Sequence, residues 1–172
     1  MSTRHHSALH LAACAVVAAA LTAQAPPTAS AAEGPSPATA PAALTHGQSS
    51  LEAQTLELIN QHRRTAGCQP LRPLPALQSA ASRHSDFMAR AHALVHSTTP
   101  PPSGHDGHRR PPRAWAENIA TGHPTAATVV TAWMNSPGHR RNILNCAYTH
   151  TGLGLTAYQG RTWWTHLLAT AP

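Results

Sequence analysis

Apolar side chains recur every three or four positions along two stretches of the chain, which is the spacing of one face of an α-helix. In the first stretch, Ser49 and Glu52 have the form of a capping box, and Gly67 provides a C-terminal stop. In the second stretch, Pro75 suits the first turn of a helix. We therefore expect helices over residues 49–66 and 75–93. Their apolar faces comprise Leu51, Leu56, Leu58, Ile59 and Ala66 in the first and Leu77, Ala80, Ala81, His84, Met88 and Ala91 in the second.

Two shorter helices are expected further along the chain. Pro124 opens the third, which carries apolar residues as far as Trp133 and breaks at 135–137. Ser136 then predicts the cap of a short fourth helix, with Pro137 at its first position.

The end of the chain has the alternating pattern of a β-hairpin. Apolar residues alternate over 152–158, Gln159 and Gly160 favour a turn, and residues 161–168 return. On such a strand one of Trp163 and Trp164 must face the core, while the other is exposed or lines a cleft. Helices followed by an antiparallel hairpin predict a layered α+β fold rather than a doubly wound parallel sheet.

The first 48 residues have a different character. Residues 1–31 resemble an export signal, with Arg4 before an apolar run at 11–21 that is too short to span a bilayer. Cleavage is expected after Ala31 rather than after Ala25, which would leave a proline at the new terminus. Cys14 leaves lipidation as an alternative. Residues 32–48, rich in Pro and Ala, are expected to form a disordered linker, so that the folded domain spans 49–170 of a secreted, monomeric protein without a transmembrane helix.

Composition narrows the range of functions. The 172 residues include 12 basic ones, all of them arginine, and only 6 acidic ones. Without lysine the chain has no Schiff-base or phosphate-loop lysine, and few carboxylates are available for two-metal phosphoryl transfer. The arginines are scattered and no aromatic residues interleave them, which argues against nucleic acid. Outside a cell such a positive surface favours anionic wall polymers or lipid headgroups.

Two cysteines remain once the signal is removed, Cys68 and Cys146. An even number in an exported chain predicts one disulfide. The alternative is a pair of metal-binding thiols, but no further Cys or His lies beside either residue at zinc-ligand spacing.

Three polar residues are candidates for the chemistry of the protein: His96, Glu117 and His139. His139 falls at the third position of the expected fourth helix, where the positive end of the helix dipole disfavours imidazolium. Neutral imidazole is the form that binds metal or accepts a proton, although a simple capping role is an equal alternative. Glu117 is a lone acid in an apolar run, which indicates a paired carboxylate.

Other histidines invite weaker interpretations. His84 lies on the apolar face of the second helix, where a hydrogen-bonded core histidine is expected rather than a ligand. His105, Asp106 and His108 form a possible metal cluster within the Pro/Gly-rich loop at 97–113. A flexible loop, however, positions ligands poorly.

The strings AENIA, AWMNSPGHRRNIL and TGLGL follow in that order after a helix that ends in His-Ser. In this the chain resembles the bacterial branch of the CAP superfamily over residues 49–168. This SCP-like domain is shared with cysteine-rich secretory proteins, plant pathogenesis-related proteins and insect venom allergens. The resemblance implies a three-layer α-β-α sandwich with a central antiparallel sheet and a wide cleft.

The resemblance also implies a site. In eukaryotic members two His and two Glu line the cleft and can hold a divalent metal, often zinc. His96 matches the first His, Glu117 the first Glu and Trp133 the tryptophan of the following helix. The second Glu has no counterpart in 136–139, and His139 belongs to the bacterial SPGH motif, which we expect to face the same cleft. Asn118, Trp133 and Ser136 are candidate ligand-binding residues.

Three functions fit these expectations. The first is a secreted module whose cleft binds a small apolar or anionic ligand such as a lipid, a glycan or a wall fragment, with or without a metal. The second is a hydrolase in which Glu117 activates a water held by His96 and His139. The third is a structural extracellular scaffold in which the polar residues only tie loops together. The family fold does not decide among them.

Overall fold

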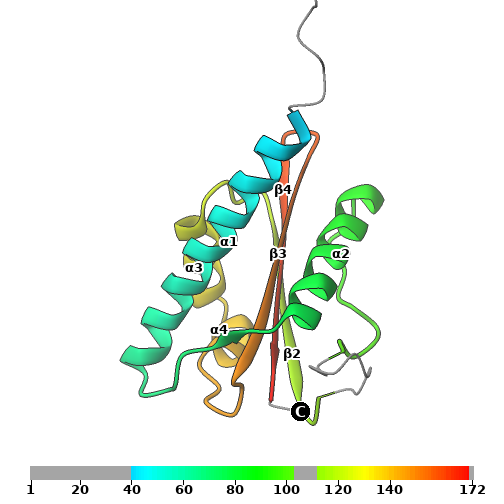
Figure 1. Ribbon diagram of the computed structural model, residues 1–172. Helices are drawn as coiled ribbons and strands as arrows, with labels where there is room; N and C mark the ends of the chain where they lie inside the picture. The colour runs from blue at the N-terminus through cyan, green and yellow to red at the C-terminus, as the bar shows by residue number, and fades with distance from the viewer. Residues whose placement is uncertain (1–39, 103–111, 171–172) are drawn as a thin grey trace, which may run out of the picture. The chain divides into compact units, whose positions relative to one another are not determined.

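The computed structural model describes residues 40–102 and 112–170, with side chains from residue 47 onward. The expected export signal, the alternative of lipidation at Cys14 and the possible metal cluster at 105–108 therefore lie outside the described residues. Four helices and four strands follow one another along the chain (Figure 1). In order they are α1 Ala40–Thr65, β1 Arg72–Pro73, α2 Pro75–Ala91, β2 Trp115–Thr121, α3 Ala126–Asn135, α4 Pro137–Ile143, β3 His150–Tyr158 and β4 Arg161–Ala169.

The first helix begins earlier than expected. Residues 40–48 belong to α1 rather than to the disordered linker expected there, so Ser49 lies inside the helix and forms no capping box. Pro41 lies in the first turn, where its missing N–H has no helical partner to lose, and the following Ala and Leu residues favour helix. In place of a cap contact, Glu52 reaches β3 and α2.

A four-stranded sheet forms the middle layer, in the order β1-β3-β4-β2. β3 and β4 are the expected hairpin, β2 pairs antiparallel with β4, and the two residues of β1 pair parallel with β3. Helices α1, α3 and α4 cover one face and α2 covers the other (Figure 1). The architecture is the expected three-layer α-β-α sandwich, although the parallel pairing of β1 makes the sheet mixed rather than wholly antiparallel. Within the described part of the chain, no helix is long and apolar enough to cross a bilayer.

Each face of the sheet has its own apolar core. The larger lies under α1, α3 and α4 and includes Trp133 and Trp164. The smaller lies under α2, where Trp163 packs with Met88, Ala89 and Ile119. Both adjacent tryptophans are therefore buried, which corrects the expectation that one of them could be exposed. The reason is that helices cover both faces of the sheet, so that β4 is buried on both sides from Trp163 onward.

Helix α2 lies unusually close to β3, and two glycines make this approach possible. A Cβ atom on Gly152 would lie 2.1 Å from the backbone carbon of Leu77, and one on Gly154 would lie 2.3 Å from that of Ala81. No side chain fits in that space, so the Gly-Leu-Gly sequence of β3 sets the height of α2 above the sheet.

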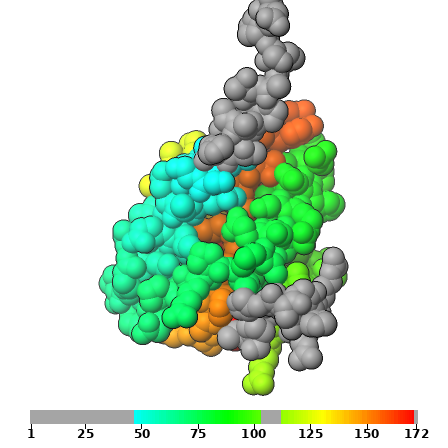
Figure 2. All heavy atoms as spheres, viewed as in Figure 1, coloured from blue at the N-terminus to red at the C-terminus, as the bar shows by residue number. Residues whose placement is uncertain are grey.

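Side chains complete the edge of β3 beyond the short β1. The Gln78 amide donates to the Leu153 carbonyl and accepts from the Leu153 N–H at 3.1 Å, as a neighbouring strand would. Glu52 Oε1 then accepts from the Leu155 N–H at 2.9 Å, and its Oε2 accepts from Gln78 at 3.1 Å. In the space-filling view β3 is visible as a narrow orange strip between α1 and α2 (Figure 2). Burial of the Glu52 carboxyl raises its pKa to about 7.

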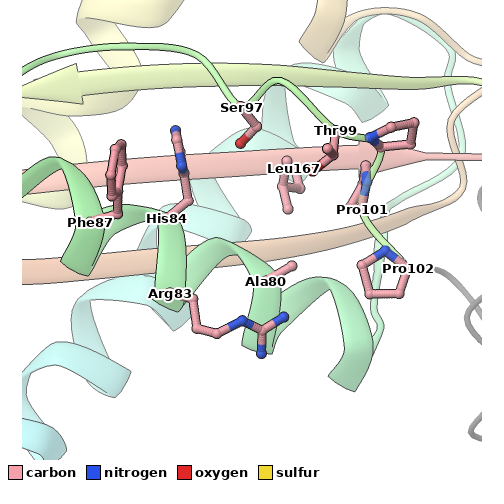
Figure 3. A pocket seen from close by; sticks show the side chains of 10 residues that line it. Ala80, Arg83, His84, Phe87, Ser97, Thr99, Pro101, Pro102 and Leu167 are labelled. Carbon is pink, nitrogen blue, oxygen red and sulfur yellow. The ribbon is translucent and has the colours of Figure 1, made fainter.

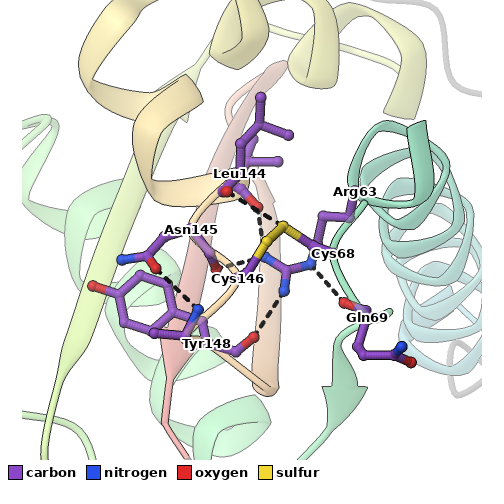
Figure 4. The surroundings of a disulfide bond; sticks show 9 residues. Arg63, Cys68, Gln69, Leu144, Asn145, Cys146 and Tyr148 are labelled. Atoms are coloured by element: carbon purple, nitrogen blue, oxygen red, sulfur yellow. Dashed lines mark hydrogen bonds between the residues drawn. A yellow bond between two sulfur atoms is a disulfide. The ribbon is translucent and has the colours of Figure 1, made fainter. Parts of the chain in front are cut away.

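A buried arginine and a disulfide join the end of α1 to the segment after α4 (Figure 4). Cys68 and Cys146 form the expected disulfide. Beside it lies the fully buried side chain of Arg63. Its guanidinium donates at 2.6–3.0 Å to four backbone carbonyls, those of Gln69, Ile143, Asn145 and Tyr148. Because carbonyls rather than a carboxylate satisfy this cation, the contact depends on the position of the backbone itself.

Candidate functional site

Glu117 is the centre of a polar cluster on the α2 face of the sheet. It lies on β2 opposite Leu167 of β4, and only 7% of the residue is exposed. Its Oε1 accepts from the His96 Nδ1 at 2.8 Å and from the Ser97 N–H at 2.9 Å. Its Oε2 accepts from the Ser97 hydroxyl at 2.5 Å. Three donors therefore compensate for the burial of this carboxylate, which leaves it little capacity to activate a water.

His84 belongs to the same cluster, although the sequence assigned it only to the helix core. Its Nε2 lies 2.9 Å from the Val95 carbonyl and 3.7 Å from Glu117 Oε2. The expected hydrogen bond is present, but the imidazole stands beside the carboxylate rather than deep in the core. The segment 95–97 is thereby tied to α2 through His84 and to β2 through Glu117.

His96 presents its other ring nitrogen away from the carboxylate. Because Glu117 accepts at Nδ1, that nitrogen carries a proton and the neutral ring keeps its lone pair at Nε2. The His96 side chain is 59% exposed. An accessible imidazole with its tautomer set by a carboxylate can bind a metal, accept a proton or accept a hydrogen bond from a ligand.

His139 lies close enough to His96 for the two imidazoles to influence each other's charge. Burial lowers the pKa of His139, and the neighbouring His96 lowers it further. Both effects favour the neutral imidazole that the sequence predicts, with burial as the larger cause. His139 occupies the third position of α4, whose N-cap is Ser136; the Ser136 side chain makes no capping bond.

Two expected ligand-binding residues hold the scaffold instead. Asn118 is fully buried and donates to the His139 carbonyl at 3.2 Å, while it accepts from Asn142 at 2.9 Å. Trp133 is 1% exposed and donates to the Ile119 carbonyl at 3.4 Å. Both fix α3 and α4 against β2 and thereby position His139. Ser136 is partly exposed at the junction of these helices.

The cluster meets only part of the requirement for a zinc ion. His96 and His139 supply two imidazoles, but both oxygens of Glu117 already accept from protein donors. Protein zinc sites use three or four ligands, and no group of three or more suitable side chains occurs within 40–102 and 112–170. The residues in this arrangement do not fit a closed metal site.

A pocket of about 590 Å³ lies next to this cluster, between α2 and residues 97–102. His84 and Ser97 extend toward each other from opposite sides, and Leu167 of β4 lies behind them (Figure 3). The rest of the lining is mainly apolar, with Phe87 and Pro100–Pro102, and Arg83 adds one cation. The sequence did not point to Arg83 or Ser97, and it indicated a core histidine at His84. Two of these residues carried a signal, because Ser97 directly follows His96 and His84 is a histidine on an otherwise apolar helix face.

Comparison with known proteins places the chain in a family. Residues 56–167 match the model of the cysteine-rich secretory protein family, CAP. The uncharacterized protein YkwD of Bacillus subtilis is 37% identical over 109 residues, which are 62% of this chain and 42% of that protein. The chain thus spans less than half the length of this relative.

Solved structures agree with the family match. An extracellular protein of Bacillus anthracis that contains an SCP domain superposes with a TM-score of 0.62 at 26% identity, over 76% of this chain and 43% of the other. An outer surface protein of Borrelia burgdorferi has the same fold, with a TM-score of 0.58 at 17% identity over 68% and 90% of the two chains. The chain therefore belongs to the CAP, or cysteine-rich secretory protein, family.

Proposed function

We propose that the protein is a secreted binding module. Its ligand is a small molecule with an apolar body and an anionic group, held in the pocket between α2 and residues 97–102. An export-signal pattern and the extracellular and outer-surface descriptions of two structural relatives support secretion. The apolar lining with Arg83 at its side supports this class of ligand.

One observation carries the choice of binding over hydrolysis. The carboxylate that a hydrolase would use as its base accepts three hydrogen bonds from protein groups. Its role in our proposal is to fix the Ser97 wall of the pocket and the tautomer of His96. The imidazole of His96, next in the chain to Ser97 of the pocket wall, keeps a nitrogen that can accept a hydrogen bond.

Titration calorimetry with decanoate tests this proposal. Decanoate should bind, while decanol and acetate, which each lack one feature, should bind at least tenfold more weakly. Arg83→Gln should weaken decanoate binding by about tenfold, the effect of one charge-assisted contact. Arg90→Gln is the matched control, because Arg90 is an exposed arginine of the same helix that does not line the pocket. Equal binding of decanoate by both variants would refute the assignment of the site.

Metal binding by the two imidazoles is a second proposal, supported by the tautomer of His96 and the neutral state of His139. A ligand from outside the described residues, or solvent, would have to complete the set. Metal analysis of the purified wild type and of His139→Ala tests it. Stoichiometric zinc in the wild type that is lost in the variant supports the proposal, whereas zinc retained equally by both would contradict it.

A further inference from the structure

A second hollow, of about 330 Å³, lies where the end of α2 meets the turn between β3 and β4. Its walls come from the residue after α2 and from both sides of the hairpin tip. They are His92, Tyr158, Gln159, Arg161 and Trp163. Nothing in the proposed function uses these residues.

The backbone at this hollow has an unusual conformation at two places. In the described ranges His92 and Gln159 are the two residues other than glycine with positive φ, at 50° and 47°. Such values are uncommon for residues with a side chain and carry a cost in stability. Glycine or asparagine would avoid most of this cost at a helix end or a hairpin turn. That both residues line one hollow indicates a role for their side chains there.

The lining combines ring faces with hydrogen-bond donors. The Tyr158 and His92 rings lie 5.5 Å apart at 55°, and Tyr158 is 39% exposed, so that its ring is accessible. Arg161 and Gln159 supply a guanidinium and an amide, and no carboxylate belongs to the lining among the residues that the structure describes. Behind them Trp163 is 3% exposed, and its Nε1–H meets no acceptor among the described residues.

From this lining we infer a second binding site, for a single sugar ring that carries a carboxylate. The volume, at the lower end of the range for ligand pockets, suits one ring rather than a chain. The aromatic faces would pack against the C–H face of the sugar. The guanidinium of Arg161 would bind the carboxylate, and the amide of Gln159 would bind a hydroxyl group.

This site is separate from the pocket proposed above. Leu167 lines that pocket and Trp163 lines this hollow, and the two residues lie four positions apart on β4. At the rise of a β-strand this separation is about 13 Å. The two linings share no residue, so that a substitution in one site leaves the other testable.

Titration of the purified protein with glucuronate, followed by NMR of the tryptophan indole N–H groups, tests the inference. Glucuronate should shift the Trp163 signal with saturation, whereas glucose and acetate should bind at least tenfold more weakly. Tyr158→Ala and Arg161→Gln should each weaken binding tenfold or more. Tyr158→Phe, which keeps the ring, should bind as the wild type does and shows that a loss in Tyr158→Ala reflects the missing ring.

Arg113→Gln is the matched control for charge. Arg113 is an exposed arginine just before β2, at the end of the sheet opposite the hairpin turn. The Arg113→Gln variant should bind glucuronate as the wild type does, and so should Arg83→Gln. If Arg113→Gln and Arg161→Gln weaken glucuronate binding equally, the arginines attract anions only through their charge, and the inference of a site is wrong. Acetate binding as tight as glucuronate binding, or the absence of a saturable shift with glucuronate, would also overturn the inference.

Discussion

Replacing Glu52 by Gln should remove a pH-dependent loss of stability. Burial raises the pKa of this carboxyl from 4.5 to about 7 in the folded protein. Below pH 4.5 the carboxyl is protonated in both the folded and the unfolded state, so that its ionisation does not lower the free energy of unfolding. As the pH rises toward 7 the unfolded state ionises first, so that the free energy of unfolding of the wild type falls. Above pH 7 the loss is complete and constant.

The size of this loss follows from the surroundings of the carboxyl. For a group removed from water, a shift of this size corresponds to roughly 3 kcal/mol. Glu52 is only partly buried, and solvent screens its charge, so that we expect about half, on the order of 1–2 kcal/mol. The Gln variant keeps the acceptor for the Leu155 N–H and loses the contact with Gln78. The loss of this contact lowers the free energy of unfolding of the variant by the same amount at every pH.

Urea unfolding at intervals between about pH 4.5 and 8.5 measures the difference between wild type and Glu52→Gln. The difference should change by about 1–2 kcal/mol in favour of the variant as the pH rises. Glu57→Gln is the control on the same helix, because Arg64 lowers the pKa of the exposed Glu57 and the slope should not follow that of Glu52. A difference that stays constant with pH, or that moves in favour of the wild type, would refute the reasoning.

Three further substitutions test other parts of the structure by urea unfolding. Gly154→Ala should cost about 3 kcal/mol or more, because its Cβ would meet the backbone of Ala81 at 2.3 Å; a cost below about 1 kcal/mol would be inconsistent with the close approach of α2. Arg63→Met should cost about 3 kcal/mol or more, because it removes the buried guanidinium that donates to four carbonyls; a cost below about 1 kcal/mol would contradict this role. Burial lowers the pKa of His166 from 6.5 to about 3, so that the wild type should lose roughly 1.4 kcal/mol per unit as the pH falls below 6.5. His166→Leu should flatten this acid limb, and an unchanged limb would contradict the assignment.

Much of the secondary structure could be predicted from the sequence, because α2 and the β3–β4 hairpin follow simple periodicities. β2 could not. Its run from Trp115 to Thr121 is buried on both sides over most of its length, so that no alternation of apolar and polar residues marks it as a strand. The same double coverage explains why Trp163 and Trp164 are both buried.

The candidate site divides in a similar way. The motifs pointed to His96, Glu117 and His139, and the structure brings His96 into contact with Glu117 and close to His139. The place of His84 depends on how the loop after α2 folds back over the helix, which no local spacing encodes. Asn118 and Trp133 belong to the same motifs, but their roles are set by burial, which a motif does not reveal.

Completion of the sheet edges by side chains bears on how the protein behaves when it is concentrated. An open strand invites a second molecule to pair with it, and repeated pairing leads to fibres. Here Gln78 and Glu52 occupy backbone groups on the part of β3 that the short β1 leaves open, and Asn142 and Trp133 occupy carbonyls on the outer strand β2. Two molecules could join their sheets only after these internal contacts were broken, and this barrier opposes aggregation.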